Sequence, residues 1–208
     1  MKKLFVIATG SSGKIRDFAH ILGTEDIEFK TLKDIGFNEE IVENGSSFAE
    51  NAIIKSDTTA RWLQKSGIEA TVLADDSGLE VFALNGAPGI FSARYSGIHG
   101  ADLDNNNLLL KNLNGITNRE ARYFCALSYQ TITRNNDGEL IVSAPHIFEG
   151  ECRGSINYAP VGSMGFGYDP LFVPDGETRT FAQMDLEEKK AISHRGNAIR
   201  ALKKYFEK

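Results

Sequence analysis

Hydrophobic and polar positions follow two different periods along the chain, which indicates both strands and helices. Residues 4–8 form a continuous apolar run typical of a buried strand, and residues 15–22 have a helical spacing that ends at Gly23. The sequence Ser47-Phe48-Ala49-Glu50 has the S-x-x-E form of a capping box, and it predicts a helix as far as about Gln64. Such alternation of strands and helices favours an α/β fold.

The remainder of the chain is richer in predicted strands. Strand-like stretches occur at residues 71–74, 79–84, 122–133, 140–142 and 146–156. Helix-like stretches occur at residues 103–113 and 186–206, the second of them broken near Ser193. Short turns such as residues 136–138 join the later strands, which should therefore pair as antiparallel hairpins. No repeat or linker interrupts the pattern, so we expect one domain over residues 1–208.

Composition favours a soluble cytoplasmic protein. The net charge is -5, which argues against general electrostatic binding of nucleic acid or of an acidic membrane surface. The apolar run at residues 4–8 is shorter than the roughly 7–15 residues of a secretion signal, and no segment is long enough to cross a bilayer. Cys125 and Cys152 lie far apart and outside any CxxC pattern, so we expect buried, reduced thiols.

The stretch 9–14, Thr-Gly-Ser-Ser-Gly-Lys, lies between the first predicted strand and the first predicted helix. Backbone N–H groups converge at such a turn, the helix N-terminus favours an anion, and Lys14 adds a positive charge. In a Walker A loop the glycines are further apart and Ser or Thr follows the lysine, whereas Ile15 follows it here. Taken alone, the motif is typical either of a phosphate loop or of an ordinary turn.

Two adjacent carboxylates, Asp75 and Asp76, close an apolar strand. Successive side chains of a strand point to opposite faces, so the two aspartates should have different tasks. Carboxylates at the end of a strand suit Mg²⁺, which bridges to substrate phosphates, but an Asp pair also caps turns. A further acidic loop includes Glu43. We prefer Glu43 to Glu50 as a metal-side carboxylate because the capping box already accounts for Glu50.

Two segments near the C-terminus carry groups suited to a planar ligand. In Gly-Phe-Gly-Tyr-Asp-Pro, residues 165–170, Phe166 can stack on a base and Asp169 can accept a hydrogen bond from a ring N–H. A hairpin turn with packed aromatic rings would explain the same residues. In residues 187–196, Lys189, His194 and Arg195 supply donors for ligand oxygens if they lie beside a phosphate loop.

The order of these motifs is more specific than any one of them. The chain contains, in this order, T-G-x-x-G-K, S-F-x-E-N-A, A-D-D-S-G-L, G-A-P-G-I-F-S-A-R-Y-S-G, G-F-G-Y-D-P and E-E-K-x-A-I-S-H-R-G. It strongly resembles the inosine/xanthosine triphosphate pyrophosphatases, the HAM1-like or RdgB-like family. The resemblance extends from about Leu4 to Leu202, which is nearly the whole chain.

The resemblance implies a fold and a reaction. The fold is an elongated mixed β-sheet with flanking helices, arranged as two lobes around a central cleft. The reaction is Mg²⁺-dependent hydrolysis of a purine nucleoside triphosphate to the monophosphate and pyrophosphate, with the deaminated substrates ITP, dITP, XTP and dXTP preferred. A homodimer is the usual state.

The same resemblance assigns roles to residues by motif. Asp76 is implied to be the general base and a metal ligand, and we expect Glu43 and Asp75 as further metal-side carboxylates. The triphosphate loop comprises Thr9, Gly10, Ser11, Ser12, Gly13 and Lys14. The base pocket comprises Phe166, Gly167, Tyr168, Asp169, Lys189, His194 and Arg195. Further substrate contacts are implied for Ser77, Lys55 and Arg94.

One residue departs from the family pattern, because Ser11 stands where the family loop usually carries Asn. Donors from the His194-Arg195 segment would select a 6-keto oxygen and reject the amino group of adenine, since unpaired buried donors are costly. Two other functions stay open. A Maf-like pyrophosphatase would act on other bases, although the H-R-G and G-F-G-Y-D signatures argue against it. A non-catalytic nucleotide-binding regulator would bind nucleotide without releasing pyrophosphate.

Overall fold

The computed structural model describes residues 2–9 and 12–207. Its contacts divide the chain into two compact units. Unit 1 comprises Met1–Asp76, Ala126–Glu149 and Ala198–Lys208, and unit 2 comprises Ser77–Cys125 and Gly150–Asn197. The first passage of the chain from one unit to the other therefore falls between Asp76 and Ser77, inside the motif that carries the paired aspartates.

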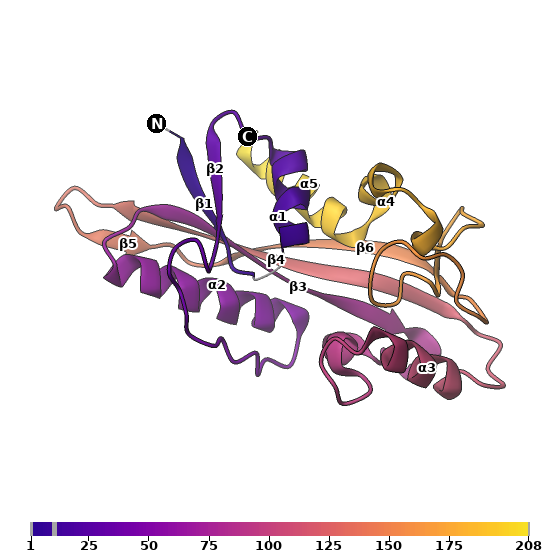
Figure 1. The fold of residues 1–208 in the computed structure, drawn as a ribbon. Helices are drawn as coiled ribbons and strands as arrows, with labels where there is room; N and C mark the ends of the chain where they lie inside the picture. The colour runs from indigo at the N-terminus through magenta and orange to yellow at the C-terminus, as the bar shows by residue number, and fades with distance from the viewer. Residues whose placement is uncertain (1, 10–11, 208) are drawn as a thin grey trace. The chain divides into compact units, whose positions relative to one another are not determined.

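The described residues form one seven-stranded sheet in the order β2-β1-β3-β4-β6-β7, with β5 paired to β4 (Figure 1). The strands are β1 Lys3–Ile7, β2 Ile27–Thr31, β3 Ala70–Val81, β4 Glu120–Arg134, β5 Leu140–Val142, β6 His146–Ile156 and β7 Phe172–Pro174. β1 pairs in parallel with β2 and β3, whereas β4–β5 and β6–β7 are antiparallel. The sheet is therefore mixed, as the family resemblance implied, and an expected hairpin with a short turn is confirmed at β4–β5.

Helices flank the sheet. They are α1 Ser12–Leu22, α2 Phe48–Lys65, α3 Asp102–Asn112, α4 Leu186–Ile192 and α5 His194–Phe206, with 3₁₀ turns at Phe82–Leu84, Gly89–Arg94 and Phe181–Gln183. The predicted break in the last helix is confirmed, because Ser193 separates α4 from α5 in extended geometry. Within the described part of the chain, no helix combines the length and the apolar character needed to span a membrane.

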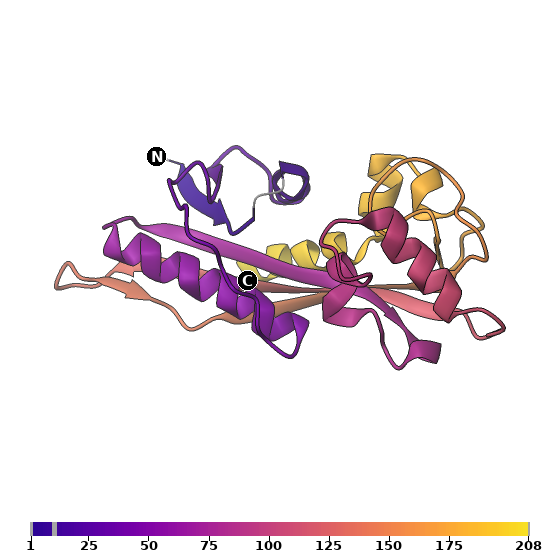
Figure 2. The same ribbon diagram turned by 60° about the horizontal axis from the view of Figure 1, so that its bottom comes forward.

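The core of unit 1 shows how strand alternation distributes side chains. Val6 of β1 and Val72 of β3 are fully buried in one cluster with Ala60 and Leu63 of α2. Phe5, the neighbour of Val6, makes ring contacts with Phe29 and Phe206 outside that cluster, as expected when successive side chains point to opposite faces. Figures 1 and 2 show α1 and α2 on opposite sides of β3, so each face of the strand has its own helix.

Unit 2 has a separate core of aromatic and aliphatic side chains. Tyr123 of β4 lies at its centre, with ring centroids 4.8 Å from Phe172 and 5.9 Å from Phe181. Leu109 and Leu113, from α3 and the residue after it, are buried in the same cluster. This packing fixes α3 and the 3₁₀ turn Phe181–Gln183 to one core. Both elements are hydrogen-bonded to the loop of residues 165–170, which is described below.

The structure corrects the expected strands at 71–74 and 79–84. They are one continuous strand, β3, which passes through Asp75-Asp76-Ser77 without a turn. The polar residues stay extended because the aspartates have charged partners on both faces, given below. The end of the expected second strand is a 3₁₀ turn at Phe82–Leu84. β2 was not predicted, and its side chains are only partly buried or exposed.

Candidate functional site

Asp75 and Asp76 point to different partners, as the alternation of a strand predicts. The Asp75 carboxylate is almost fully buried and forms an ion pair with Lys14 of α1, with Nζ–Oδ1 3.0 Å. The Asp76 carboxylate instead accepts from two side chains of α2: Asn51 Nδ2 at 3.1 Å and Lys55 Nζ at 3.3 Å. Each aspartate therefore contacts a different helix, in agreement with the helix positions in Figures 1 and 2.

Lys55 joins two carboxylates into one cluster in unit 1. Its Nζ donates to Glu43 Oε2 at 2.8 Å as well as to Asp76 Oδ1, and its side chain is largely buried. Burial alone would lower the pKa of Lys55, but the carboxylates of Asp76, Asp75 and Glu43 outweigh it and raise that pKa. Lys55 is thus held in its charged form, which lets both carboxylates lie close together.

The Asp76 carboxyl is harder to ionise than an exposed aspartate. Burial raises its pKa, and the charge of Glu43 acts in the same direction. The charge of Lys55 and the hydrogen bond from Asn51 oppose this rise without cancelling it. A carboxylate with a raised pKa is a stronger base than a free one, which suits a group that accepts a proton from water near neutral pH.

Glu50 is engaged in starting α2. The Ser47 hydroxyl accepts from Glu50 N at 3.2 Å, as the capping box predicted. The Glu50 carboxylate accepts from the backbone N of Ser46 at 2.6 Å and from its hydroxyl at 2.7 Å. These hydrogen bonds lower the pKa of Glu50. Its engagement here supports the preference for Glu43 as the carboxylate nearer Asp76.

The donor set of this cluster suits Mg²⁺. In proteins Mg²⁺ is commonly bound by one or two carboxylates together with substrate phosphates. Glu43 and Asp76 direct one oxygen each at a single cationic group, the Lys55 ammonium. Among the described residues no group of three or more His, Cys, Asp or Glu side chains is arranged to hold a metal ion. The fit therefore rests on two carboxylates and the ligand's own oxygens, and Asp75 is paired with Lys14.

The N-terminal loop is described only in part. Thr9 follows β1, and its N–H donates to the Ile7 carbonyl at 2.7 Å. Gly10 and Ser11 lie outside the described residues. Ser12 and Gly13 are the first residues of α1, whose first turn contains no acidic residue. Lys14 follows in the same turn, so its pairing with Asp75 links the start of α1 to β3.

In unit 2, the predicted base-pocket loop is organised around the buried Asp169 carboxylate. Asp169 Oδ2 accepts from Phe166 N at 2.9 Å and forms an ion pair with Lys189. The Lys189 ammonium also lies 4.9 Å from the centre of the Phe166 ring. Phe166 is 66% exposed. Gly165 has φ +83°, and a Cβ there would collide with the Asp169 carboxylate. The loop thus presents an exposed aromatic ring from a fixed turn.

His194 and Arg195 are held by different partners in unit 2. The His194 ring stacks on Tyr123, with centroids 4.8 Å apart and planes at 9°. Arg195 Nη2 donates to Ser77 Oγ at 3.2 Å. The Tyr123 hydroxyl also lies 3.5 Å from Asp169 Oδ1, and burial raises the pKa of Tyr123, which keeps the phenol neutral. Tyr123 was not predicted as a site residue, because a single apolar strand position carries no sign of this stacking.

Two other predicted substrate contacts, Tyr168 and Arg94, lie in surroundings that are less suited to binding a ligand. The Tyr168 side chain is buried in the core of unit 2, and its hydroxyl donates to the Ser92 carbonyl at 2.9 Å. That position favours a structural role for its side chain. The Arg94 guanidinium lies 5.3 Å from the centre of the Phe91 ring within its own 3₁₀ turn. The predicted role of Arg94 in binding phosphate stays a prediction.

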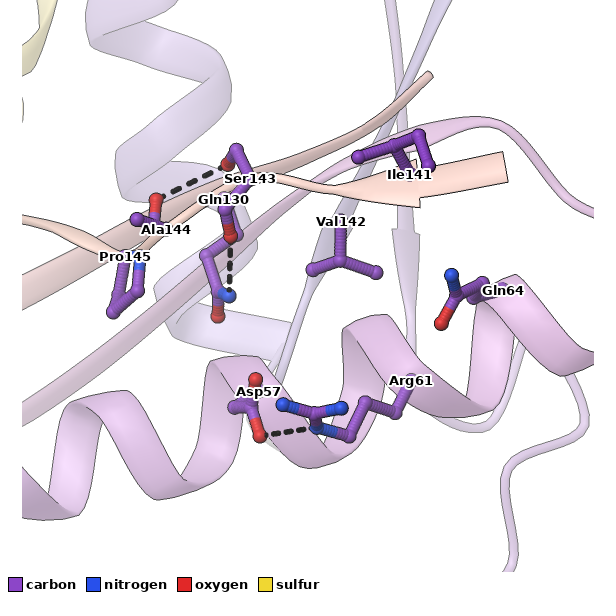
Figure 3. Close-up of a pocket in the computed structure, with 9 residues that line it drawn as sticks. All are labelled: Asp57, Arg61, Gln64, Gln130, Ile141, Val142, Ser143, Ala144 and Pro145. Atoms are coloured by element: carbon purple, nitrogen blue, oxygen red, sulfur yellow. Dashed lines mark hydrogen bonds and ion pairs between the residues drawn. The ribbon is translucent and has the colours of Figure 1, made fainter. Parts of the chain in front are cut away.

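A pocket of about 400 Å³ lies elsewhere in unit 1, between α2 and the β5 segment (Figure 3). Its lining comprises Asp57, Arg61, Gln64, Gln130, Ile141, Val142, Ser143, Ala144 and Pro145. Asp57 and Arg61 form an ion pair with each other, and Gln130 bonds to Ser143 O and to Ser56. None of the residues that the motifs single out lines this pocket.

The fold and these side chains together define a mixed-sheet α/β protein with a carboxylate–lysine cluster in one unit and an aromatic, cation-bearing loop in the other. The chain belongs to the Ham1 family, whose model matches residues 5–205.

Similar proteins agree with this assignment. A dITP/XTP pyrophosphatase of Syntrophobacter fumaroxidans is 45% identical over 98% of this chain and 82% of its own length. One of Listeria innocua is 43% identical over 96% of this chain and 92% of its own length. The solved structure of the Staphylococcus aureus Ham1 protein has a TM-score of 0.84 at 40% identity, over 99% of this chain and 98% of that one.

The raised pKa of Asp76 predicts that Asp76→Asn stabilises the folded protein. In the folded state the ionised carboxylate is disfavoured, so its cost appears as the pH rises through the raised pKa. Asn carries no charge, so at pH 7.5 in EDTA the variant should melt at a higher temperature than the wild type. The difference should shrink at acid pH, where the wild-type carboxyl is also neutral. Asp26→Asn, at an exposed position, is the matched control. A lower melting temperature for Asp76→Asn at pH 7.5 would contradict this electrostatic picture.

Proposed function

We propose that this protein hydrolyses the deaminated purine nucleoside triphosphates ITP, dITP, XTP and dXTP to the monophosphate and pyrophosphate. One observation carries the proposal: Glu43 and Asp76 converge on a single buried cation, Lys55, at the point of β3 where the family motif has its catalytic aspartate. Membership of the Ham1 family and 45% identity to a dITP/XTP pyrophosphatase support the same substrate class.

Residues of unit 1 would act on the triphosphate. Attack at the α-phosphorus requires a positioned water, a base, and neutralisation of charge on the phosphate oxygens. Asp76 would orient the water and accept its proton, helped by the burial that raises its pKa. Lys14 and Lys55 would neutralise phosphate charge, each moving from a carboxylate partner to a phosphate oxygen. The loop from Thr9 to Lys14 would bind phosphate through its backbone N–H groups.

Mg²⁺ would be held by Glu43 and Asp76, with Asp75 as a further carboxylate nearby in sequence. When bound, the metal supplies Lewis-acid stabilisation of charge on the phosphate oxygens. The observation that supports this site is that two carboxylate oxygens already share one positive charge. Lys55 would then have to give up part of its contact with these carboxylates, which leaves its ammonium available for the substrate.

Residues of unit 2 would recognise the base. Phe166, the exposed ring of the loop, would stack on the purine, and the cations of Lys189 and Arg195 would donate toward the 6-keto oxygen together with His194. Adenine has an amino group at that position, so it would leave these donors unpaired at a cost of about 1–3 kcal/mol each. Ser77, next in the chain to Asp76, would contact the substrate itself, beside its hydrogen-bond partner Arg195.

We further propose that the enzyme acts in the cytoplasm as a homodimer. The family resemblance supports the dimer, and the two buried free cysteines support a reducing compartment. Sedimentation velocity measures the assembly directly, and a monomer at micromolar concentration would contradict this part of the proposal.

The substrate prediction is tested by pyrophosphate release from ITP, dITP, XTP, ATP, GTP and dTTP, with and without Mg²⁺. We expect the deaminated purines to be hydrolysed at least about 10²-fold faster than ATP, because a site built for a keto oxygen rejects an amino group strongly. Equal rates across the purines would contradict the proposed selectivity. A preference for dTTP would indicate a pyrophosphatase for other bases, and nucleotide binding without pyrophosphate release would indicate a regulator.

The different partners of the two aspartates predict different catalytic effects. Asp76→Asn should lower kcat by at least about 10²-fold, the low end for loss of a general base. Asp75→Asn should cause the smaller loss, because its carboxylate is bonded to Lys14. Rates at saturating Mg²⁺, with melting curves to confirm folding, make the comparison. If the two variants are equally stable and Asp75→Asn lowers kcat more than Asp76→Asn does, the general base has been assigned to the wrong face of β3.

A further inference from the structure

Gly167, in the loop that carries Phe166, has both of its backbone polar groups bonded to side chains of one helix. Its N–H donates to Asp102 Oδ2 at 2.7 Å, and its carbonyl accepts from Asn106 Nδ2 at 2.9 Å. Both side chains come from α3, where a spacing of four residues places them on the same helix face. We name this arrangement the Gly167 clamp.

The clamp restrains a glycine, a residue with no side chain that could hold its own backbone in place. Gly167 has φ +60°, and a Cβ built there would meet no atom within 4 Å, so side-chain packing does not hold this backbone in place. Glycine is also the residue with the greatest backbone freedom. The N–H belongs to the peptide group shared with Phe166, and the carbonyl belongs to the group shared with Tyr168. The peptide group before Gly167 is also held by Asp169 N, which donates to the Phe166 carbonyl at 3.2 Å. The clamp adds a second bond to that group and a bond to the peptide group after Gly167.

The helix that makes the clamp is itself firmly placed. Leu109 of α3 is fully buried in the core of unit 2. Asn105 accepts from Ser96 N at 2.8 Å, which ties the helix to the preceding segment. A clamp residue on such a helix can hold the loop in one position.

Asn106 has a further feature that packing alone does not explain. Its side chain is only 9% exposed, yet its Oδ1 has no hydrogen-bond partner within the described part of the chain. Leaving a buried acceptor unpaired is costly, so an apolar residue would be the more stabilising choice there. An apolar residue could not donate the hydrogen bond that Asn106 Nδ2 makes to the Gly167 carbonyl.

We propose that Asp102 and Asn106 are positioning residues for base selectivity. By fixing the peptide planes at Gly167 they hold Phe166 in the orientation in which its exposed ring meets the purine, beside Lys189. Neither side chain needs to touch the substrate. The inference rests on the proposed function, because it gives the clamp a role only if Phe166 contacts the base.

The test compares selectivity, which a merely structural role would not change. Asp102→Ala removes the acceptor, and Asn106→Leu removes the donor at similar size. We expect each to lower kcat/KM for ITP by about 3–10-fold, the effect of one lost hydrogen bond, mainly through KM. The rate with ATP, which is poorly oriented in the wild type, should fall less, so the ITP/ATP ratio drops. Asp102→Asn keeps an acceptor oxygen and should restore most of the ratio.

Matched controls lie on the exposed side of the same helix. Asp104→Ala removes another acidic residue from the first turn of α3, and Asn107→Ala removes an exposed amide. Both should keep the wild-type ITP/ATP ratio. An unchanged ratio in folded Asp102→Ala and Asn106→Leu, or an equal drop in the controls, would overturn the clamp. If one clamp variant does not fold, the other decides.

The failure of the proposed function is distinguishable from failure of the clamp. A wild-type enzyme without preference for ITP over ATP would contradict the proposed function before any variant is measured. A clear wild-type preference that the clamp variants retain, with only their melting temperatures lowered, would leave the function intact and assign Asp102 and Asn106 to stability alone.

Discussion

The alternation of side chains along β3 determines what each of the two adjacent aspartates does. With α1 on one face of the strand and α2 on the other, Asp75 meets Lys14 and Asp76 meets Lys55 and Asn51. A shift of one residue in this strand would exchange the partners, since successive residues point to opposite faces. The register of β3 with β1, where Leu73 pairs with Ile7, therefore positions the Asp76 carboxylate as well as the core.

The charged groups of this protein are arranged at some cost to stability. Lys55, Asp76, Asp169 and Lys189 are all largely buried, and removing such charges from water is expensive unless they are paired. Each is paired within its own unit, Lys55 with two carboxylates and Lys189 with Asp169. Groups held in this way are already desolvated and oriented before a ligand arrives. In the proposed function, an anionic ligand would bind by taking the place of a carboxylate partner of Lys14 or Lys55.

Much of the architecture could be predicted from local patterns. Periodicity and capping signals located α2 and the break at Ser193, and strand alternation predicted that Asp75 and Asp76 diverge. The motif order identified the family, which no single motif could do. Local rules failed where partners lie far apart in sequence or where polar residues stay in a strand. The polar residues Asp75-Asp76-Ser77 predict the end of a strand. In the structure, charged partners on both faces keep these residues in extended geometry within β3.

The supporting residues of the candidate site were the least predictable part. Asn51 is 25 residues from Asp76 in sequence, and Asp102 is 65 residues from Gly167. An asparagine or aspartate on a helix gives no local sign of such a partner, because its usual position is in solvent or at a helix end. Tyr123 was hidden for a related reason, since its stacking on His194 depends on the packing of β4 against the start of α5.

Double-mutant cycles on unfolding free energy in EDTA test most directly whether β3 separates the two charge pairs. The cycles combine Lys55→Met with Asp76→Asn, Lys14→Met with Asp75→Asn, and, as the crossed pair, Lys14→Met with Asp76→Asn. Side chains in direct contact typically couple by about 0.5–3 kcal/mol, whereas independent ones add within about 0.5 kcal/mol. We predict coupling in the first two cycles that exceeds the coupling in the crossed one. A crossed pair that couples more strongly than either direct pair would contradict the assignment of Asp75 and Asp76 to opposite faces.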